Sequence, residues 1–260
     1  MCNTCGCDAN DHQHKHHAPS ASVPESAELY TAILQPDEIV AARNRQQFEH
    51  HRVLVVNLMS SPGSGKTQLI EQTIQTLNDE ITIAVIEGDL DTENDALRIR
   101  RHGVQAEQIT TGTACHLDAA MIETVLPRFS LDTIDILFIE NVGNLICPAC
   151  FDLGQDVNVV LLSVPEGDDK PEKYPVMFRA ADLMLITKTD YLPVATAFSI
   201  HRATQSFRNV GGRAPVQELA APLDRGVSAW IDWLLSAYAE KFTELSTPSP
   251  SETADAPPKC

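Results

Sequence analysis

The stretch VLVVNLMSSPGSGKT, residues 53–67, joins an apolar run to a glycine-rich loop and decides the fold. Its first seven residues are mostly β-branched or large and apolar, which is typical of a strand buried on both faces of a sheet. Apolar residues then recur at helical spacing, and we expect a helix over residues 66–78. A strand, a glycine loop and a helix in this order predict a site for phosphate groups.

The loop SSPGSGKT contains the residue types that polyphosphate binding requires. Its backbone N–H groups can surround phosphate oxygens, Lys66 can reach the terminal phosphates, and Thr67 can ligate Mg²⁺. Ser60 stands where the general motif has its first glycine, but the predicted strand and helix on either side are those of the motif. We expect nucleotide binding by Ser61, Pro62, Gly63, Ser64, Gly65, Lys66, Thr67 and Gln68.

Strand-like and helix-like segments alternate through the rest of the chain. Strands are expected at 53–59, 81–87, 134–140, 157–164 and 183–187, and helices at 36–50, 66–78, 92–102, 116–127, 192–206 and 225–242. This alternation indicates a mostly parallel sheet with helices on both faces. We therefore predict an α/β protein with a three-layer P-loop NTPase fold, in which helices flank a mostly parallel central sheet.

Length and charge limit the classes of function. With 260 residues, 43% of them hydrophobic, we expect one nucleotide-binding domain over 29–246, a flexible metal-binding arm over 1–28 and a disordered tail over 247–260. The chain has 36 acidic and 19 basic side chains, and its net charge of −17 disfavours nucleic acid and anionic membranes as partners. Without a membrane-length apolar run or a signal-peptide pattern, we expect a cytoplasmic protein.

The segment ITKTD, residues 186–190, indicates which nucleotide is bound. At the end of a strand, the carboxylate of Asp190 can accept hydrogen bonds from guanine N1–H and the exocyclic amine, which adenine cannot supply in this arrangement. Lys188 would pack its aliphatic stem along the base, and Thr187 replaces the more usual asparagine. The segment favours GTP.

Two acidic segments follow predicted strands, EGDLDTENDALRIR after the second and ENVGN after the third. In nucleotide triphosphatases such loops hold Mg²⁺, orient the attacking water and sense the γ-phosphate. We expect Mg²⁺ near Thr67, Asp89 and Glu140, and catalytic roles for Lys66, Asp95 and Glu140. For Asp91 we prefer a solvated loop.

Cysteine and histidine occur together in TGTACHLD and ENVGNLICPAC. Adjacent thiol and imidazole groups at Cys115 and His116 suit a metal, and Cys147 follows the loop expected to sense the γ-phosphate. Such ligands select Zn²⁺, Ni²⁺ or copper over Mg²⁺. Cys150 is an alternative ligand to Cys147, a fourth ligand or a small buried hydrophobic residue.

The segment CNTCGC places three thiols, Cys2, Cys5 and Cys7, close together, ahead of the histidine tract HQHKHH at residues 12–17. Three thiolates with one nitrogen form the square-planar set that Ni²⁺ favours. We expect nickel binding here, with the histidines as a looser secondary site.

The segments CNTCGC, SSPGSGKT, GDLDTENDALRIR, TGTACHLD, ENVGNLICPA and ITKTD occur in the order of a known family. The chain resembles the HypB hydrogenase nickel-incorporation GTPases, in the metallochaperone branch of the P-loop GTPases. The resemblance implies a GTPase that dimerises with GTP, works with the partner chaperone HypA and helps load nickel into the [NiFe]-hydrogenase large subunit. It also implies a tight nickel site at Cys2, Cys5 and Cys7, and a dimer-interface site for nickel or zinc at Cys115, His116 and Cys147.

Three alternatives remain open at this point. A urease-accessory GTPase would share the fold, although the CNTCGC segment argues against it. A nickel-storage protein with little GTPase activity is compatible with the departures at Ser60 and Thr187. Structural zinc at Cys115, His116 and Cys147 would predict unfolding on chelation.

Overall fold

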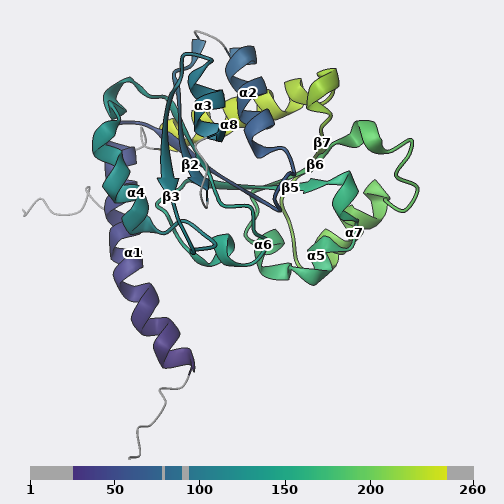
Figure 1. Ribbon diagram of the computed structural model, residues 1–260, viewed down its shortest axis with the longest axis horizontal. Helices are drawn as coiled ribbons and strands as arrows, with labels where there is room; N and C mark the ends of the chain where they lie inside the picture. Colours follow the sequence, from purple (N-terminus) through teal and green to yellow (C-terminus); the bar gives the residue numbers. More distant parts are fainter. Residues whose placement is uncertain (1–25, 78–79, 90–93, 245–260) are drawn as a thin grey trace, which may run out of the picture.

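The computed structural model describes residues 26–77, 80–89 and 94–244 and contains one seven-stranded sheet, with every pair of neighbouring strands parallel. The strand order is β3-β2-β4-β1-β5-β6-β7 (Figure 1). The strands are β1 (Leu54–Ser60), β2 (Ile83–Asp89), β3 (Gln105–Thr110), β4 (Ile136–Glu140), β5 (Val157–Ser163), β6 (Leu183–Thr187) and β7 (Val216–Glu218). The α/β prediction, with a mainly parallel central sheet, is confirmed.

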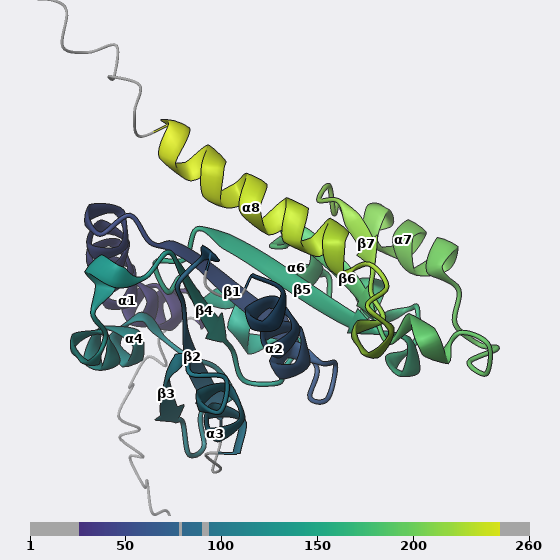
Figure 2. The same ribbon diagram turned by 90° about the horizontal axis from the view of Figure 1, so that it is seen from above.

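Helices cover both faces of the sheet. They are α1 (Ser26–His50), α2 (Lys66–Leu77), α3 (Asn94–Arg100), α4 (Ala119–Val125), α5 (Lys170–Lys173), α6 (Pro175–Arg179), α7 (Ile200–Asn209) and α8 (Val227–Glu244). Figure 2 shows α8 lying along the sheet on the same side as α2. Side chains from α1, α4, α6 and α7 pack against the other face.

The alternation of side chains along β1 explains the three layers. Leu54, Val56 and Leu58 face the cluster that contains residues of α2, α3 and α8, whereas Val55 faces the cluster formed with α1 and α4. All seven residues of β1 are buried. A strand at the centre of a parallel sheet is covered on both sides, so its apolar run is continuous rather than alternating.

All five predicted strands are present within two residues of their predicted ends, but β3 and β7 were not predicted. These two strands form the edges of the sheet. β3 reads QAEQIT and is only partly buried, while β7 has three residues, none of them buried. An edge strand does not need an apolar run on both faces, so the pattern that revealed the central strands is missing at the edges.

The helix predictions were less accurate at their starts. Helix α1 begins at Ser26 rather than at residue 36, and α7 begins at Ile200 rather than at residue 192. The short helices α5 and α6 were not predicted. The predicted helix 116–127 in fact begins at Ala119, because Asp118 caps it by accepting a 2.7 Å hydrogen bond from Met121 N. This later start leaves Cys115 and His116 outside the helix.

Several sequence predictions lie outside the described residues: the metal-binding arm up to residue 25, with the cysteines of the CNTCGC segment and the histidine tract, Asp91, and the tail over 247–260. Within the described part of the chain, no helix combines the length and the apolar character needed to cross a membrane.

Candidate nucleotide and metal sites

The glycine-rich loop connects β1 to α2 with the backbone freedom that its sequence predicts. Gly63 and Gly65 have φ angles of +74° and +101°, which side-chain-bearing residues rarely adopt. The Ser64 hydroxyl donates to Ser61 O at 2.9 Å within the loop. Thr187, at the end of β6, donates to Ser64 O at 2.7 Å. The threonine that replaces the usual asparagine therefore ties the loop to the end of β6.

A cavity of about 600 Å³ opens above this loop. It lies at the carboxyl ends of β1, β2 and β4, where ligands bind in open α/β sheets. The predicted residues that line it are Pro62, Gly63, Gly65, Lys66, Thr67, Gln68, Asp89, Asp95, Glu140 and Lys188. Ser64 and Asp190 line an adjoining cavity, whereas Ser61 lines neither and donates to Glu166.

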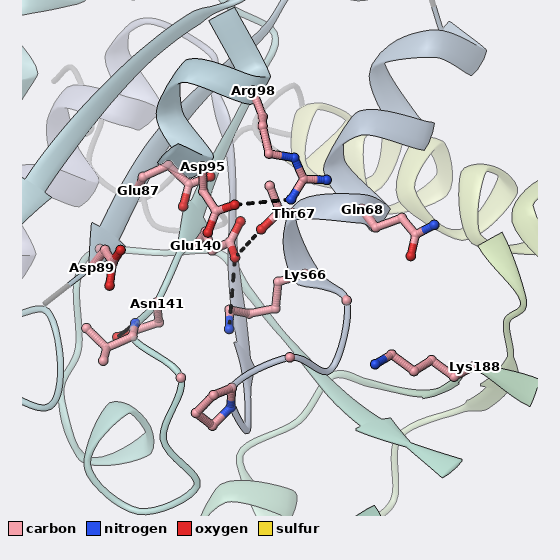
Figure 3. Close-up of a pocket in the computed structure, with 16 residues that line it drawn as sticks. Lys66, Thr67, Gln68, Glu87, Asp89, Asp95, Arg98, Glu140, Asn141 and Lys188 are labelled. Atoms are coloured by element: carbon pink, nitrogen blue, oxygen red, sulfur yellow. Dashed lines mark hydrogen bonds and ion pairs between the residues drawn. The ribbon is translucent and has the colours of Figure 1, made fainter. Parts of the chain in front are cut away.

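The charged groups at the floor of the cavity contact one another (Figure 3). Thr67 Oγ1 donates to Glu140 Oε1 at 2.9 Å, and Lys66 Nζ lies 3.9 Å from the same oxygen. Lys66 also donates to Ser60 Oγ at 3.2 Å, so the residue that departs from the motif binds the lysine. Among the described residues, no partner reaches Glu140 Oε2. A hydroxyl beside a buried carboxylate with an open oxygen fits Mg²⁺.

Glu87 is a second buried carboxyl that sequence reasoning missed. It lies on β2 directly beside Glu140 of β4, because the two residues are paired in the parallel register. Burial raises the pKa of Glu87 well above its ordinary value, and the neighbouring Glu140 raises it further. Burial also raises the pKa of Glu140, against the opposing effect of Lys66. The only sequence signal was an acidic residue at the end of the largely apolar run ITIAVIE.

Arg98 was also missed, although it lines the same cavity. Its guanidinium donates to Glu71 at 2.6 Å and to Asp95 at 3.1 Å (Figure 3 shows the second contact). The ion pair links α3 to α2 and orients the Asp95 carboxylate within the cavity wall. The signal was present in the segment DALR, where arginine follows aspartate by three residues, one helical turn.

The adjoining cavity of about 260 Å³ has the chemistry of a base-binding site. Lys188 has a left-handed backbone, with φ of 58°, and lines both cavities. Asp190 follows in the same turn, and within the described part of the chain its Oδ1 atom is buried without a hydrogen-bond partner. A buried, unpaired carboxylate oxygen can accept the N–H groups that guanine presents.

The predicted cysteine and histidine ligands come together in space. Atoms of Cys115, His116 and Cys147 that could bind a metal all lie within 4.8 Å of one another. The Cys115 and Cys147 sulfurs are 2.8 Å apart, and Cys115 Sγ lies 3.8 Å from His116 Nδ1. Burial lowers the pKa of His116, which favours the neutral imidazole that binds metals. The thiol–thiol hydrogen bond raises the pKa of Cys147.

The loop over residues 141–147, which we call the linking loop, connects the cavity to the group of Cys115, His116 and Cys147, which we call the thiol cluster. Asn141 follows Glu140 and accepts a hydrogen bond from Leu117 N at 3.2 Å, next to His116. Asn144 donates to Cys115 O at 3.2 Å. A Cβ atom on Gly143 would lie 2.8 Å from the Pro62 Cα atom, so only glycine allows this approach to the phosphate-binding loop. One segment therefore contacts both sites.

Comparisons with known proteins agree with this arrangement. The family model of the CobW/HypB/UreG nucleotide-binding domain matches residues 54–217. The hydrogenase maturation factor HypB of Escherichia coli (strain K12) is 48% identical over 218 residues, which cover 84% of this chain and 75% of that protein. The hydrogenase/urease maturation factor HypB of Helicobacter pylori (strain ATCC 700392 / 26695) is 39% identical over 222 residues, or 84% and 90% of the two chains.

A solved structure gives the same result. The crystal structure of HypB from Helicobacter pylori in complex with nickel is 40% identical, with a TM-score of 0.75, and the match covers 80% of this chain and 97% of that one. This chain thus belongs to the CobW/HypB/UreG nucleotide-binding family and, within it, to the HypB hydrogenase maturation factors.

Proposed function

We propose that this HypB protein is a GTP-hydrolysing nickel chaperone that helps insert nickel into the [NiFe]-hydrogenase large subunit. The observation that carries the proposal is the linking loop. It follows Glu140, which contacts Lys66 and Thr67, and it ends at Cys147, whose sulfur contacts Cys115. A segment with these two ends can transmit the state of the nucleotide to a metal ligand.

The cavity residues divide into three roles in this proposal. Thr67 and Glu140 would hold Mg²⁺ with Asp89 beside them, and the ion would neutralise charge on the phosphates. Lys66 would bind the terminal phosphates, while Asp95 and Glu140 would orient the attacking water. Lys188 and Asp190 would bind the guanine base and select GTP.

The thiol cluster would hold the transported ion. Cys115, His116 and Cys147 supply two sulfurs and one nitrogen, a soft donor set that suits Ni²⁺ or Zn²⁺. The nickel complex of the Helicobacter pylori relative supports nickel as the cargo. We propose a second, tight nickel site at Cys2, Cys5 and Cys7, which lie outside the described residues.

Nucleotide and metal would influence each other through the linking loop. GTP can shift the metal site only if it binds one loop conformation more tightly than another, and linkage then requires the metal to change GTP affinity by the same factor. Asn141 and Asn144 hold the backbone at Leu117 and Cys115, so a loop movement would displace those hydrogen bonds. Hydrolysis would then release the metal from its GTP-bound arrangement.

Protein partners are part of the proposal. We propose that two copies associate when GTP binds, and that HypA and the hydrogenase large subunit receive or supply the nickel. Ile146, immediately before Cys147, is 61% exposed and offers an apolar contact next to the cluster. The HypB family's role as hydrogenase maturation factors supports partners of this kind.

Paired measurements test the coupling. GTP turnover and GTP affinity are measured with and without stoichiometric Ni²⁺ in the wild type and in Cys147→Ala. We expect Ni²⁺ to change the wild-type values and to have a smaller effect in the variant. Both proteins carry Cys2→Ser, Cys5→Ser and Cys7→Ser, so that nickel binding to the CNTCGC segment cannot cause the change in GTP turnover or affinity. Identical values in all conditions would reject the proposed coupling.

Urease maturation is a second candidate role, because the Helicobacter pylori relative is named for both hydrogenase and urease. The same GTP-dependent delivery would then supply a second nickel enzyme. Deleting the gene and measuring hydrogenase and urease activities in the same cells separates the roles. Loss of hydrogenase activity alone would exclude the second candidate.

A further inference from the structure

Cys150 lies beside the thiol cluster and is not part of the proposed three-residue site. Residues Cys147–Cys150 form one turn of 3₁₀ helix with the sequence CPAC. Cys150 is exposed, which removes the possibility that it is a small buried hydrophobic residue. Its sulfur makes only a 3.8 Å contact with Ile146 O. A thiol is a weak donor, so little is lost when this side chain rotates.

The three-residue site lacks one ligand for a closed tetrahedral ion. Cys115, His116 and Cys147 contribute one donor atom each. Zinc in structural sites takes four protein ligands, in sets such as Cys₃His, whereas three protein ligands leave a position open. A fourth thiol close to the cluster would therefore change both the affinity and the geometry of the site.

The segment that carries Cys150 is fixed to the cluster at both ends. At one end, the Cys147 sulfur contacts the Cys115 sulfur at 2.8 Å. At the other end, the Phe151 ring stacks on the His116 ring, with centroids 3.7 Å apart and planes 14° from parallel. Cys150 lies between these two contacts, so it cannot move far from the other ligands without breaking one of them.

The 3₁₀ turn places the two thiols of CPAC on the same side. In this helix the side chains at positions i and i+3 eclipse, and the rise is about 2 Å per residue, so Cys150 follows Cys147 about 6 Å along the axis. A Cys-x-x-Cys pair is also the spacing with which zinc sites chelate one ion. The Cys150 sulfur is not among the donor atoms that lie within 4.8 Å of one another, so binding requires this side chain to rotate toward an ion at Cys147.

We propose that Cys150 is a fourth ligand of this site and brings the donors that one chain supplies to three sulfurs and one nitrogen. The inference rests on metal binding at Cys115, His116 and Cys147, as proposed above. With a fourth ligand the site can close around an ion in the tetrahedral arrangement that Zn²⁺ takes, whereas Ni²⁺ favours square-planar sets. Cys150 therefore controls which ion the site prefers, and its displacement would open a position for nickel.

Zn²⁺ and Co²⁺ titrations test the ligand set. The full-length protein carries Cys2→Ser, Cys5→Ser and Cys7→Ser to remove the proposed nickel site of the CNTCGC segment. Zn²⁺ affinity is measured in competition with a chromophoric chelator. Adding Cys150→Ser should lower Zn²⁺ affinity at least about tenfold. That is the lower end of the loss expected when a residue that only hydrogen-bonds to a metal ligand is replaced, and a direct ligand should matter at least as much. With Co²⁺ bound, the sulfur-to-metal charge-transfer absorption should fall by about a third, because the number of bound thiolates falls from three to two.

Two further variants make each outcome decisive. Cys115→Ser is the positive control, and Cys260→Ser controls for the removal of a thiol elsewhere. If Cys150→Ser binds Zn²⁺ like its parent, or binds more weakly without a change in Co²⁺ absorption, Cys150 is not a ligand and the inference is wrong. If Cys115→Ser also binds like its parent, the cluster itself is not the metal site and that part of the proposed function fails as well. Cys150 is exposed, so its replacement should leave the melting temperature of the metal-free protein unchanged.

Discussion

The nucleotide cavity and the thiol cluster lie at opposite ends of the linking loop, but they are built differently. In the cavity, Lys66 and Glu140 are 7% and 6% exposed and lie at the ends of regular elements. In the cluster, Cys115 and Cys147 are only partly buried, in a turn and in a single 3₁₀ turn. Rigid, buried charges suit the recognition of one ligand, whereas ligands on short turns can rearrange to accept and release an ion.

Removing the P-loop lysine should separate the two regions most strongly. Lys66→Ala removes the cation that would face the terminal phosphates, and GTP turnover should fall at least about 10²–10³-fold, as when a preorganised electrostatic contact is lost. Zn²⁺ binding to the thiol cluster should be unchanged, because Lys66 contacts Ser60 and Glu140 but none of the ligands. Phosphate release and a Zn²⁺ titration measure the two effects. Loss of Zn²⁺ binding would show that the regions are not separable.

The proposed base site in the adjoining cavity can be tested by replacing one carboxylate oxygen of Asp190 with an amide nitrogen. Asp190→Asn replaces an acceptor with a donor opposite the guanine N–H groups, so GTP affinity should fall about 10–100-fold, the loss of one or two hydrogen bonds to a charged group. Xanthosine triphosphate, which presents a carbonyl in place of the exocyclic amine, should bind the variant better than GTP does. Equilibrium binding of both nucleotides checks this, with Asp224→Asn as an exposed control. Unchanged GTP affinity would contradict the assignment of the base site.

The buried carboxyl pair, Glu87 and Glu140, should lower the free energy of unfolding of the nucleotide-free protein at neutral pH. Glu87 has a raised pKa in the folded protein, so its contribution to stability is complete below the ordinary value of 4.5 and is lost as the pH rises through the folded pKa. Glu87→Gln removes this ionisable group, so it should stabilise the nucleotide-free protein near pH 7 by at least about 1.4 kcal/mol, the equivalent of one unit of raised pKa. The difference from wild type should vanish toward pH 4.5. Urea unfolding across this pH range gives the answer, and a pH-independent difference would argue against the pair.

The linking loop can be weakened without replacing any residue of either ligand set. Asn144→Ala removes the 3.2 Å hydrogen bond to Cys115 O. It should reduce the effect of Ni²⁺ on GTP affinity, which is typically about 5–150-fold for coupled sites, while leaving GTP affinity without metal nearly unchanged. Isothermal titrations with and without Ni²⁺ measure both. Full coupling in the variant would mean that this contact does not transmit the signal.

The smallest expected effect concerns the orientation of one metal ligand. Phe151→Leu keeps an apolar side chain but removes the ring that stacks on His116. An aromatic pair contributes about 0.5–1.5 kcal/mol, so Zn²⁺ affinity should fall only about 2–10-fold. Chelator competition resolves such a change, and GTP affinity without metal should not move. A larger loss would indicate that Phe151 holds the whole turn in place.

How well a feature of the molecule could be predicted depended on whether its physical requirement involves consecutive residues or residues far apart in the chain. The apolar run of β1 and the glycines at 63 and 65 express local requirements, burial on both faces and positive φ angles, and both are visible in consecutive residues. Glu87 was missed because its importance comes from Glu140 on another strand. Glu166 was missed because its partners Ser61 and Ser64 lie about 100 residues away in the chain.

The sequence by itself determined the α/β class, and it predicted the phosphate-binding loop, the guanine-binding segment and the cysteine and histidine ligands. Each of these depends on neighbouring residues that impose one backbone conformation or one chemistry. Only the tertiary structure decided that β4 lies between β1 and β2, which brings Glu140 to Thr67 on one side and to Glu87 on the other. It also decided that the Asp118 cap frees His116 and that Cys147 meets Cys115, because such contacts depend on strand order and helix ends rather than on local pattern.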